Sequence, residues 1–598
     1  MIYKVIATEF LPLRERPLHD QDEDTYLALL KTLIKSGPMY FSYSFDITNT
    51  FQRQSQLDPS VPLWKRADDR FFWNKFVQSD LIDFRTSGTR HQQGQQPGVD
   101  PYILPVMFGM MEIIPTRVKS TPLSLVLITR RSRHRAGTRY FSRGIDEEGH
   151  VSNFNETEQI IILNDSTSGL GGFAGGGGMQ NGKVGGSGGK EVQIMSYVQT
   201  RGSVPVFWAE VNTLHYTPKL QIRGVETAVS AAQAHFDEQI RIYGDNYIVN
   251  LVKQKGREQR VKEAYEQMIK MLMTSPYEGT SGDSRSSEKF HLVESSKNQQ
   301  KFDRLHYVYF DFHNETKGLQ WHRVQLLVDQ LHDALEKQQY FRGVDMPADI
   351  EGRLEVRNHQ TSVIRTNCMD CLDRTNVVQS ILARTTLNRQ LTDLGVLSRG
   401  ETFTSDPAFE VLFRKIWADN ADVVSTSYSG TGALKTDFTR TGVRTRAGLL
   451  QDGRNSVTRY LKNNFADGPK QDAFDLFLGA YLPTTSSYLV FVDQRPLLIQ
   501  SIPYVFAFSM FFVFIGSFTR RLPDSAVLPV RIFILFWFIV AAWCANFIIK
   551  NGMLYVSPLH HQLCLNTNDC RSTGQSSTRD RGPPKDTTTL SARCERTR

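Results

Sequence analysis

The segment Arg365-Thr-Asn-Cys-Met-Asp-Cys-Leu-Asp-Arg-Thr-Asn376 decides the fold, because it joins two stretches of different periodicity. Ser362–Arg365 has the β-branched composition of a strand, and the residues after Asn376 place apolar side chains at helical spacing. The segment is therefore predicted to be a loop between a strand and a helix. After Arg365, which ends the strand, the loop gathers two cysteines, two aspartates and one arginine.

A loop of this kind can bind phosphate. Its backbone N–H groups can surround an anion, and the positive end of the following helix adds to their effect. The same field favours a thiolate at Cys368, and Arg374 offers a planar fork for two phosphoryl oxygens. These two residues have the C-x5-R spacing of cysteine-dependent phosphatases, so the sulfur is predicted to attack phosphorus and form a cysteinyl-phosphate.

The two cysteines of the loop also permit other chemistry. Cys368 and Cys371 have the C-x-x-C spacing of half a zinc site or of a redox pair. The sequence contains no second such pair, and its other cysteines lie in or beyond the apolar C-terminal region: Cys544, Cys564, Cys570 and Cys594. The context of strand, loop and helix favours the phosphate site, and we expect no metal and no other cofactor.

The surrounding sequence alternates strand and helix patterns. Strands are predicted at Met39–Phe45, Leu123–Ile128, Val204–Trp208, Tyr247–Leu251, Tyr307–Phe312 and Ser362–Arg365. Helices are predicted at Asp24–Lys35, Arg257–Met273 and Trp321–Gln338. Such alternation predicts a mixed α/β fold, with parallel strands in a sheet that helices cover.

Length and composition set limits on the class of protein. The chain of 598 residues is expected to form two or more structural units. Its six cysteines are too few for a secreted scaffold built on disulfides. A formal net charge of +8 is modest for this length and gives no reason to expect nucleic acid, although it would suit an anionic membrane surface.

Two runs without charged residues, Ile502–Phe518 and Ile532–Ile549, predict a transmembrane hairpin. At ~1.5 Å per residue each approaches the ~30 Å hydrocarbon thickness of a bilayer. The connection between the two runs contains Arg520, Arg521 and Arg531. By charge count alone, these arginines would place the connection in the cytosol. We expect the large domain there instead, because no secretory signal is visible and thiol chemistry needs a reducing compartment.

Segments outside the loop carry a resemblance to one family. They are Arg135–Tyr140, Asn153–Gln159, Gln199–Pro205, Tyr307–His313, Trp417–Asn420 and Gly430–Gly442. With the loop, they resemble the Sac-domain (suppressor-of-actin) phosphoinositide phosphatases over residues 1–481, and the hairpin resembles the membrane-anchored branch. The resemblance implies an N-terminal Sac subdomain, a cysteine-phosphatase-like catalytic domain with a mixed sheet, and a place in endoplasmic reticulum and Golgi membranes. The implied substrate is chiefly phosphatidylinositol 4-phosphate, with 3-phosphate and 3,5-bisphosphate forms also accepted.

The resemblance also implies roles for individual residues. Cys368 would be the nucleophile and Arg374 the phosphate clamp. Asp373 precedes the arginine as in the myotubularin lipid phosphatases, which makes it the first candidate proton donor, with Asp370 the second. Alternatively, Asp373 only orients Arg374 through a salt bridge. Substrate-binding residues are expected in the loop, at Met369, Cys371, Leu372, Thr375 and Asn376, and in a later basic stretch, at Lys435, Arg440 and Arg444. The alternative for the basic stretch is a solvated face without a binding role.

Two more sets of residues have both a functional and a structural interpretation. Asp311 and His313 close a predicted strand and could reach the active site. The arginines around the segment 130–139 could attract anionic lipid, but a structural role is favoured because they follow a strand of the core.

The expected divisions are a truncated N-terminal subdomain at 1–120, the catalytic domain at 121–481, a linker at 482–501, the hairpin at 502–549 and a disordered tail at 550–598. A glycine-rich stretch at 165–190 and a polar stretch at 275–300 are interpreted as surface insertions. The expected partners are phosphoinositide lipids. Two rival functions stay open: a phosphatase of phosphoproteins or soluble inositol phosphates, which the hairpin disfavours, and an inactive membrane tether, which the intact Cys368 and Arg374 disfavour.

Overall fold

The structure is a computed structural model, and it describes residues 1–10, 21–87, 98–163, 192–274, 301–317, 320–345, 354–442, 444–482, 495–518 and 527–556. The expected insertions at 165–190 and 275–300 lie outside these ranges. So do most of the expected linker and all of the expected tail beyond residue 556.

The strands are β1 (Ile2–Lys4), β2 (Met39–Ser42), β3 (Val106–Val118), β4 (Thr121–Arg131), β5 (Asn155–Leu163), β6 (Val192–Arg201), β7 (Trp208–Val211), β8 (Lys219–Ile222), β9 (Asp245–Asn250), β10 (Leu305–Tyr309), β11 (Phe341–Asp345), β12 (Leu354–Asn358) and β13 (Ser362–Asn367). The helices are α1 (Gln21–Ser36), α2 (Phe51–Gln54), α3 (Leu63–Arg66), α4 (Ser79–Ser87), α5 (Val229–Tyr243), α6 (Gln259–Thr274), α7 (Phe312–Glu315), α8 (Gln325–Gln330), α9 (His332–Gln338), α10 (Asp373–Asp393), α11 (Pro407–Ser429), α12 (Thr436–Thr441), α13 (Arg446–Phe465), α14 (Asp467–Leu478), α15 (Leu497–Phe518) and α16 (Val527–Lys550).

One large sheet organises the described residues. Its strands follow the order β1-β2-β3-β4-β5-β6-β13-β9-β10, and β11 and β12 extend it from β6. The strands from β1 to β6 pair antiparallel. In contrast, β13 pairs parallel with both β6 and β9, and β10 pairs parallel with β9. Every residue of β13 is buried, as expected for an inner strand covered on both faces.

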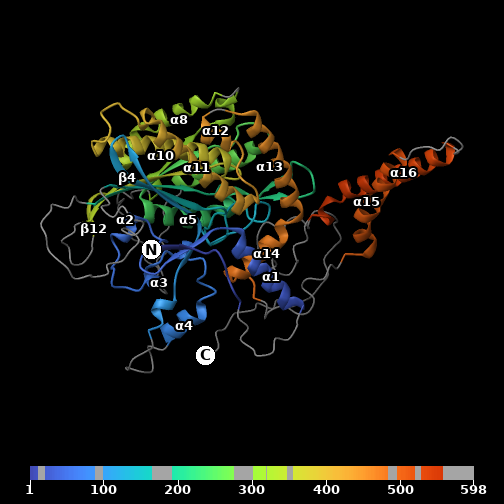
Figure 1. Ribbon diagram of the computed structural model, residues 1–598, viewed down its shortest axis with the longest axis horizontal. Helices are drawn as coiled ribbons and strands as arrows, with labels where there is room; N and C mark the ends of the chain where they lie inside the picture. Colours follow the sequence, from blue (N-terminus) through green and yellow to red (C-terminus); the bar gives the residue numbers. More distant parts are fainter. Residues whose placement is uncertain are drawn as a thin grey trace, which may run out of the picture.

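Helices cover the two faces of this sheet (Figure 1). On one face, Leu387 of α10 and Trp417 of α11 share an apolar core with Leu125 of β4. On the other, Phe236 of α5 packs in a core with Ile248 of β9. The mixed α/β class expected from the sequence is confirmed. The expected boundary at residue 120 falls between β3 and β4, which are paired neighbours in the sheet, and the division into subdomains stays a prediction.

The predicted elements are confirmed in most places. The strands β2, β4, β9, β10 and β13 and the helices α1 and α6 lie at or within a few residues of the expected positions. The strand predicted at Val204–Trp208 is wrong, because only Trp208 belongs to a strand. Pro205 has no N–H for a ladder, and the Val206 N–H bonds to the carbonyl of Val204 in a tight turn. The helix predicted at 321–338 is interrupted at Leu331, between α8 and α9.

The C-terminal helices α15 and α16 confirm the two predicted apolar helices. Both are long and apolar enough to cross a membrane, and only 11% of each apolar window is buried. They pack against each other, with Phe512 and Trp537 ring centroids 4.7 Å apart. The hairpin extends away from the large sheet and its helices (Figure 1).

Candidate active site

The cysteine loop lies at the carboxyl end of β13 and leads directly into α10. Cys371 adopts a left-handed conformation with φ of 52°, which turns the chain sharply between strand and helix. This turn directs the Cys371 backbone N–H to the Cys368 sulfur at 3.1 Å. Leu372 at the N-cap makes no side-chain capping bond, so the first turn of α10 retains backbone donors for another acceptor.

Cys368 is poised as a thiolate. Burial alone would raise its pKa, but hydrogen bonding from the Cys371 thiol, the charge of Arg374 and the Thr375 hydroxyl together lower the pKa to about 6. The Thr375 Oγ1 lies 3.5 Å from the sulfur. Only 3% of Cys368 is exposed, so the nucleophile lies beneath the surface of the closed loop.

The second cysteine has the opposite character. Burial raises the pKa of Cys371 well above its usual value, and the hydrogen bond to Cys368 adds to the rise. Its Sγ also lies 3.0 Å from the Gly202 carbonyl oxygen, a second acceptor within reach of the single S–H. The pair is therefore asymmetric, with one thiolate and one thiol that supports it, as a single nucleophile requires.

Arg374 is held by Glu258 at the start of the α6 region. Its Nη1 and Nη2 donate to the two carboxylate oxygens of Glu258 at 2.8 and 3.1 Å, and Nη1 also donates to the Leu251 carbonyl. Burial opposes ionisation of Glu258, but the guanidinium lowers the carboxyl pKa. This residue was missed by the sequence analysis, since its only link to the loop is spatial.

Asp370 is fixed by two arginines. Arg143 Nη1 and Arg139 Nη2 lie 2.6 and 3.0 Å from its carboxylate oxygens. Burial would raise the pKa of Asp370, yet these guanidinium groups hold it well below the usual range. Asn153 also donates its side-chain amide to the Asp370 carbonyl at 3.0 Å. The segments 135–140 and 153–159 thus meet the loop, and Arg143, which the sequence analysis did not single out, is part of the same contact.

Asp373 faces a different neighbour. Its carboxylate accepts the Leu434 backbone N–H at 2.6 Å and lies 3.6 Å from Arg459 Nη1. The alternative salt bridge between Asp373 and Arg374 is absent from the ion pairs of the described residues, where Arg374 pairs with Glu258. The bond to Leu434 thus gives Asp373 a structural role, because it joins the loop to the segment before α12.

The other expected loop residues form a buried layer under the cysteines. Met369 belongs to the core under α5, and Leu372 packs with Val424 and Tyr428. Asn376 donates its side-chain amide to the Trp417 carbonyl at 3.1 Å. These contacts support the shape of the loop, and whether any of these side chains touches substrate stays a prediction.

The basic stretch lies at the rim and is largely paired. Arg440 binds Asp419 at 2.7 Å and also Asp422, and Arg444 binds Asp437 and Asp452. Lys435 is close enough to Asp373 and Arg374 for their charges to act on it, and burial lowers the pKa of its amine. Of these three cations, Lys435 therefore lies nearest the loop chemistry.

His313 belongs to the same rim. Burial lowers the pKa of its imidazole, and the charges of Lys253, Lys435 and Arg374 act in the same direction. Asp311 instead caps α7 by accepting the Asn314 N–H. Of the two residues that the sequence suggested near the end of this strand, His313 is thus within electrostatic reach of the loop.

Arg201 was not anticipated at all. It is fully buried at the end of β6, the parallel neighbour of β13, and its Nη2 lies 3.4 Å from the Asn376 oxygen. Burial lowers the pKa of Arg201 to about 10, against the opposing effect of Cys371 and Cys368. Only its place in a segment that resembles the family, 199–205, could have drawn attention to it.

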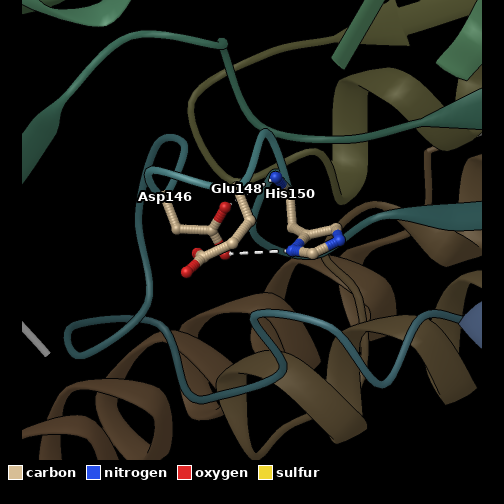
Figure 2. A group of neighbouring side chains, drawn as sticks. All are labelled: Asp146, Glu148 and His150. Carbon is tan, nitrogen blue, oxygen red and sulfur yellow. Dashed lines mark hydrogen bonds and ion pairs between the residues drawn. The ribbon is translucent and has the colours of Figure 1, made fainter. Parts of the chain in front are cut away.

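One further cluster lies outside the cysteine loop. Asp146, Glu148 and His150 place their ligand atoms within 4.8 Å of one another (Figure 2). The His150 backbone N–H and ring Nδ1 both bond to the Asp146 carboxylate, at 2.6 and 3.4 Å. The packing of Gly149 against α5 closes the same turn. These are the contacts of a tight turn, and we assign the cluster no catalytic role.

Comparisons with known proteins show what the chain as a whole is similar to. Residues 1–317 match the family described as the SacI homology domain. The phosphatidylinositol-3-phosphatase SAC1 of Saccharomyces cerevisiae is 40% identical over 93% of this chain and 80% of the relative. The phosphatidylinositol-3-phosphatase SAC1-A of Danio rerio is 35% identical over 93% and 83%. The phosphoinositide phosphatase SAC6 of Arabidopsis thaliana is 35% identical over 83% and 72%.

Proposed function

The chain belongs to the SacI homology family and is a phosphoinositide phosphatase, and from this premise we propose that it hydrolyses chiefly phosphatidylinositol 4-phosphate through a cysteinyl-phosphate. The 3-phosphate and 3,5-bisphosphate forms are proposed as further substrates. The observation that carries the mechanism is the set of donors around the Cys368 sulfur, the Cys371 N–H at 3.1 Å and the Thr375 hydroxyl at 3.5 Å. With the charge of Arg374 they favour an ionised nucleophile at neutral pH.

In the first proposed step, the Cys368 sulfur attacks phosphorus as the bond from phosphorus to the inositol oxygen breaks. The free backbone donors at the start of α10 hold the phosphoryl oxygens. Arg374 completes the cradle when the phosphate displaces the Glu258 carboxylate, which occupies both arms of its fork in the unliganded loop. Water then cleaves the sulfur–phosphorus bond, releasing inorganic phosphate and restoring the thiolate.

The departing inositol oxygen needs a proton, because an alkoxide is a poor leaving group. Asp370 is a poor candidate, since Arg139 and Arg143 keep it ionised. We propose Asp373 as the donor, at the start of α10 and adjacent to Arg374. Its carboxylate accepts the Leu434 N–H and lies 3.6 Å from Arg459 Nη1.

The proposed location is the membrane of the endoplasmic reticulum and Golgi, with the catalytic domain in the cytosol. A hairpin of α15 and α16 returns the chain to the side from which it entered. A cytosolic domain keeps Cys368 and Cys371 in a reducing compartment, and neither is joined in a disulfide.

Phosphate release from vesicles that each contain one phosphoinositide tests the proposal. The full-length protein is expected to act fastest on phosphatidylinositol 4-phosphate, and Cys368→Ser to release no phosphate. If the wild type and Cys368→Ser bind the lipid equally and neither releases phosphate, the result would support the membrane tether instead. Faster release from a phosphopeptide or a soluble inositol phosphate would contradict the lipid specificity.

A further inference from the structure

Helix α13 has its polar and apolar faces in an unusual arrangement. The side that faces the domain buries two polar side chains, Arg459 and Asn463. The opposite side exposes large apolar side chains: Leu449, Leu450, Val457, Leu461 and Phe465. Residues 450, 457, 461 and 465 recur at helical spacing and so form one outward stripe, with Leu450 77% exposed. A soluble surface helix would show the reverse pattern, so this stripe indicates a nonaqueous neighbour.

The stripe is continuous with the base of the membrane hairpin. Tyr460 of α13 donates its hydroxyl to the Leu214 carbonyl at 2.6 Å, in the turn between β7 and β8. Leu214 in turn packs against the apolar cluster of Ile502 in α15 and Tyr555 after α16. The same turn approaches the chain end of the hairpin so closely that a Cβ at Gly552 would lie 2.2 Å from the Thr213 carbonyl oxygen.

The orientation and charge of α13 suit the surface of a bilayer. In Figure 1, α13 runs along the side of the catalytic domain from which the hairpin extends, and it crosses the direction of the hairpin. A helix that crosses the spanning direction lies near the membrane plane. Arg446 and Arg454 are exposed on the same helix, where they can meet anionic headgroups. Tyr216, 76% exposed and stacked on Tyr460, extends the surface toward the hairpin.

The inner side of α13 touches the catalytic loop. Arg459 reaches the Asp373 carboxylate at 3.6 Å, and Asp452 accepts the backbone N–H of Lys435 at 2.9 Å. One helix thus connects an exposed apolar stripe on its outer side to the active-site rim on its inner side. We propose that the outer stripe of α13, together with Tyr216, lies in the headgroup region of the bilayer that holds α15 and α16, and thereby seats the catalytic loop against that bilayer. The link to turnover rests on the proposed lipid phosphatase function, whereas the contact with lipid does not.

Photocrosslinking in the full-length protein tests the contact directly. Val457 in the stripe and Val411 on α11 are both 62% exposed, which makes them a matched pair for replacement by benzoylphenylalanine. In vesicles of phosphatidylcholine and phosphatidylserine, the probe at position 457 is expected to form adducts with phospholipid and the probe at 411 is not. Equal lipid labelling at both positions, or a crosslink from 457 to a second copy of the chain, would overturn the proposal.

A charge substitution tests the consequence for turnover. Val457→Glu is expected to slow hydrolysis of phosphatidylinositol 4-phosphate in the protein's own vesicles by about tenfold, because the carboxylate opposes insertion of the stripe. Hydrolysis of a short-chain, water-soluble analogue is expected to change less than about twofold, which also reports that the variant is folded. Val411→Glu should leave both rates unchanged. An equal loss on both substrates, or no loss on the vesicles, would refute the seating role. If no substrate is hydrolysed at all, the proposed function fails, and the crosslinking result still decides the membrane contact.

Discussion

Replacement of Thr375 by valine removes one hydrogen-bond donor from the Cys368 sulfur and keeps the volume of the side chain. Against the opposing effect of burial, the Cys371 thiol, the charge of Arg374 and the Thr375 hydroxyl lower the pKa of Cys368 from an ordinary 9.0 to about 6. A hydrogen bond to a charged group contributes about 1.5 to 3 kcal/mol. Since the Thr375 contact is long at 3.5 Å, we take the lower figure, which predicts a pKa higher by about one unit.

The pKa can be read from the pH dependence of alkylation. Only the thiolate reacts with a small neutral alkylating reagent, so the rate of modification of Cys368 rises with pH and reaches half its maximum at the pKa. Mass spectrometry of the peptide that contains Cys368 gives this rate in the full-length protein. Because Cys368 is buried, the reagent reaches it only when the loop opens. This opening lowers the alkylation rate by the same factor at every pH, so the midpoint is unchanged.

The expected midpoint is about 6 in the wild type and about 7 in Thr375→Val. Thr385→Val is the matched control, because the Thr385 hydroxyl bonds to the Ile381 carbonyl of the same helix and the midpoint should stay at the wild-type value. A wild-type midpoint near that of an ordinary thiol would refute the electrostatic argument. An unchanged midpoint in Thr375→Val would refute the role of the hydroxyl.

The remaining predictions concern turnover. Cys368→Ser and Arg374→Ala should each remove nearly all phosphate release, whereas Cys371→Ser should retain much of it; equal loss in Cys371→Ser would point to a metal or dithiol site. Glu258→Gln should lower KM for vesicle substrate and keep kcat within about threefold, because the phosphate then competes with a neutral amide for Arg374. A lower kcat at constant KM would instead make Glu258 a positioning residue. Asp373→Asn should slow phosphoinositide hydrolysis far more than hydrolysis of p-nitrophenyl phosphate, whose leaving group needs no proton. Equal slowing on both substrates would leave Asp373 a structural role only.

The sequence predicted the parts of the site that depend on local order. A strand with β-branched residues, a loop rich in cysteine and aspartate, and a helical pattern follow one another without interruption, and β13 and α10 lie where they were expected. The two apolar helices could also be predicted from the sequence, because length and lack of charge suffice to identify them. The strand predicted at Val204–Trp208 was wrong because the prediction relied on apolar composition. It gave too little weight to Pro205, which has no N–H to join the hydrogen bonds of a sheet.

The partners of the loop could not be predicted from local patterns. Glu258 is 116 residues from Arg374, and nothing in the sequence near it differs from an ordinary charged helix start. Arg143 is more distant still from Asp370. Pairing between such residues is decided by the order of strands in the sheet, which brings β6, β13 and β9 together from separate parts of the chain.

These distant partners show how the fold sets the chemistry of two neighbouring acids. Asp370 is tied to Arg139 and Arg143, from the segment before β5, and that pairing keeps its carboxylate ionised. Asp373 is tied to Leu434, in the turn before α12, and to Arg459 of α13. Because the loop is held from both directions along the chain, its shape depends on segments that precede and follow it. A fragment that lacks α13 would lose the Arg459 contact together with the exposed stripe, and with them both the loop support and the proposed seat on the membrane.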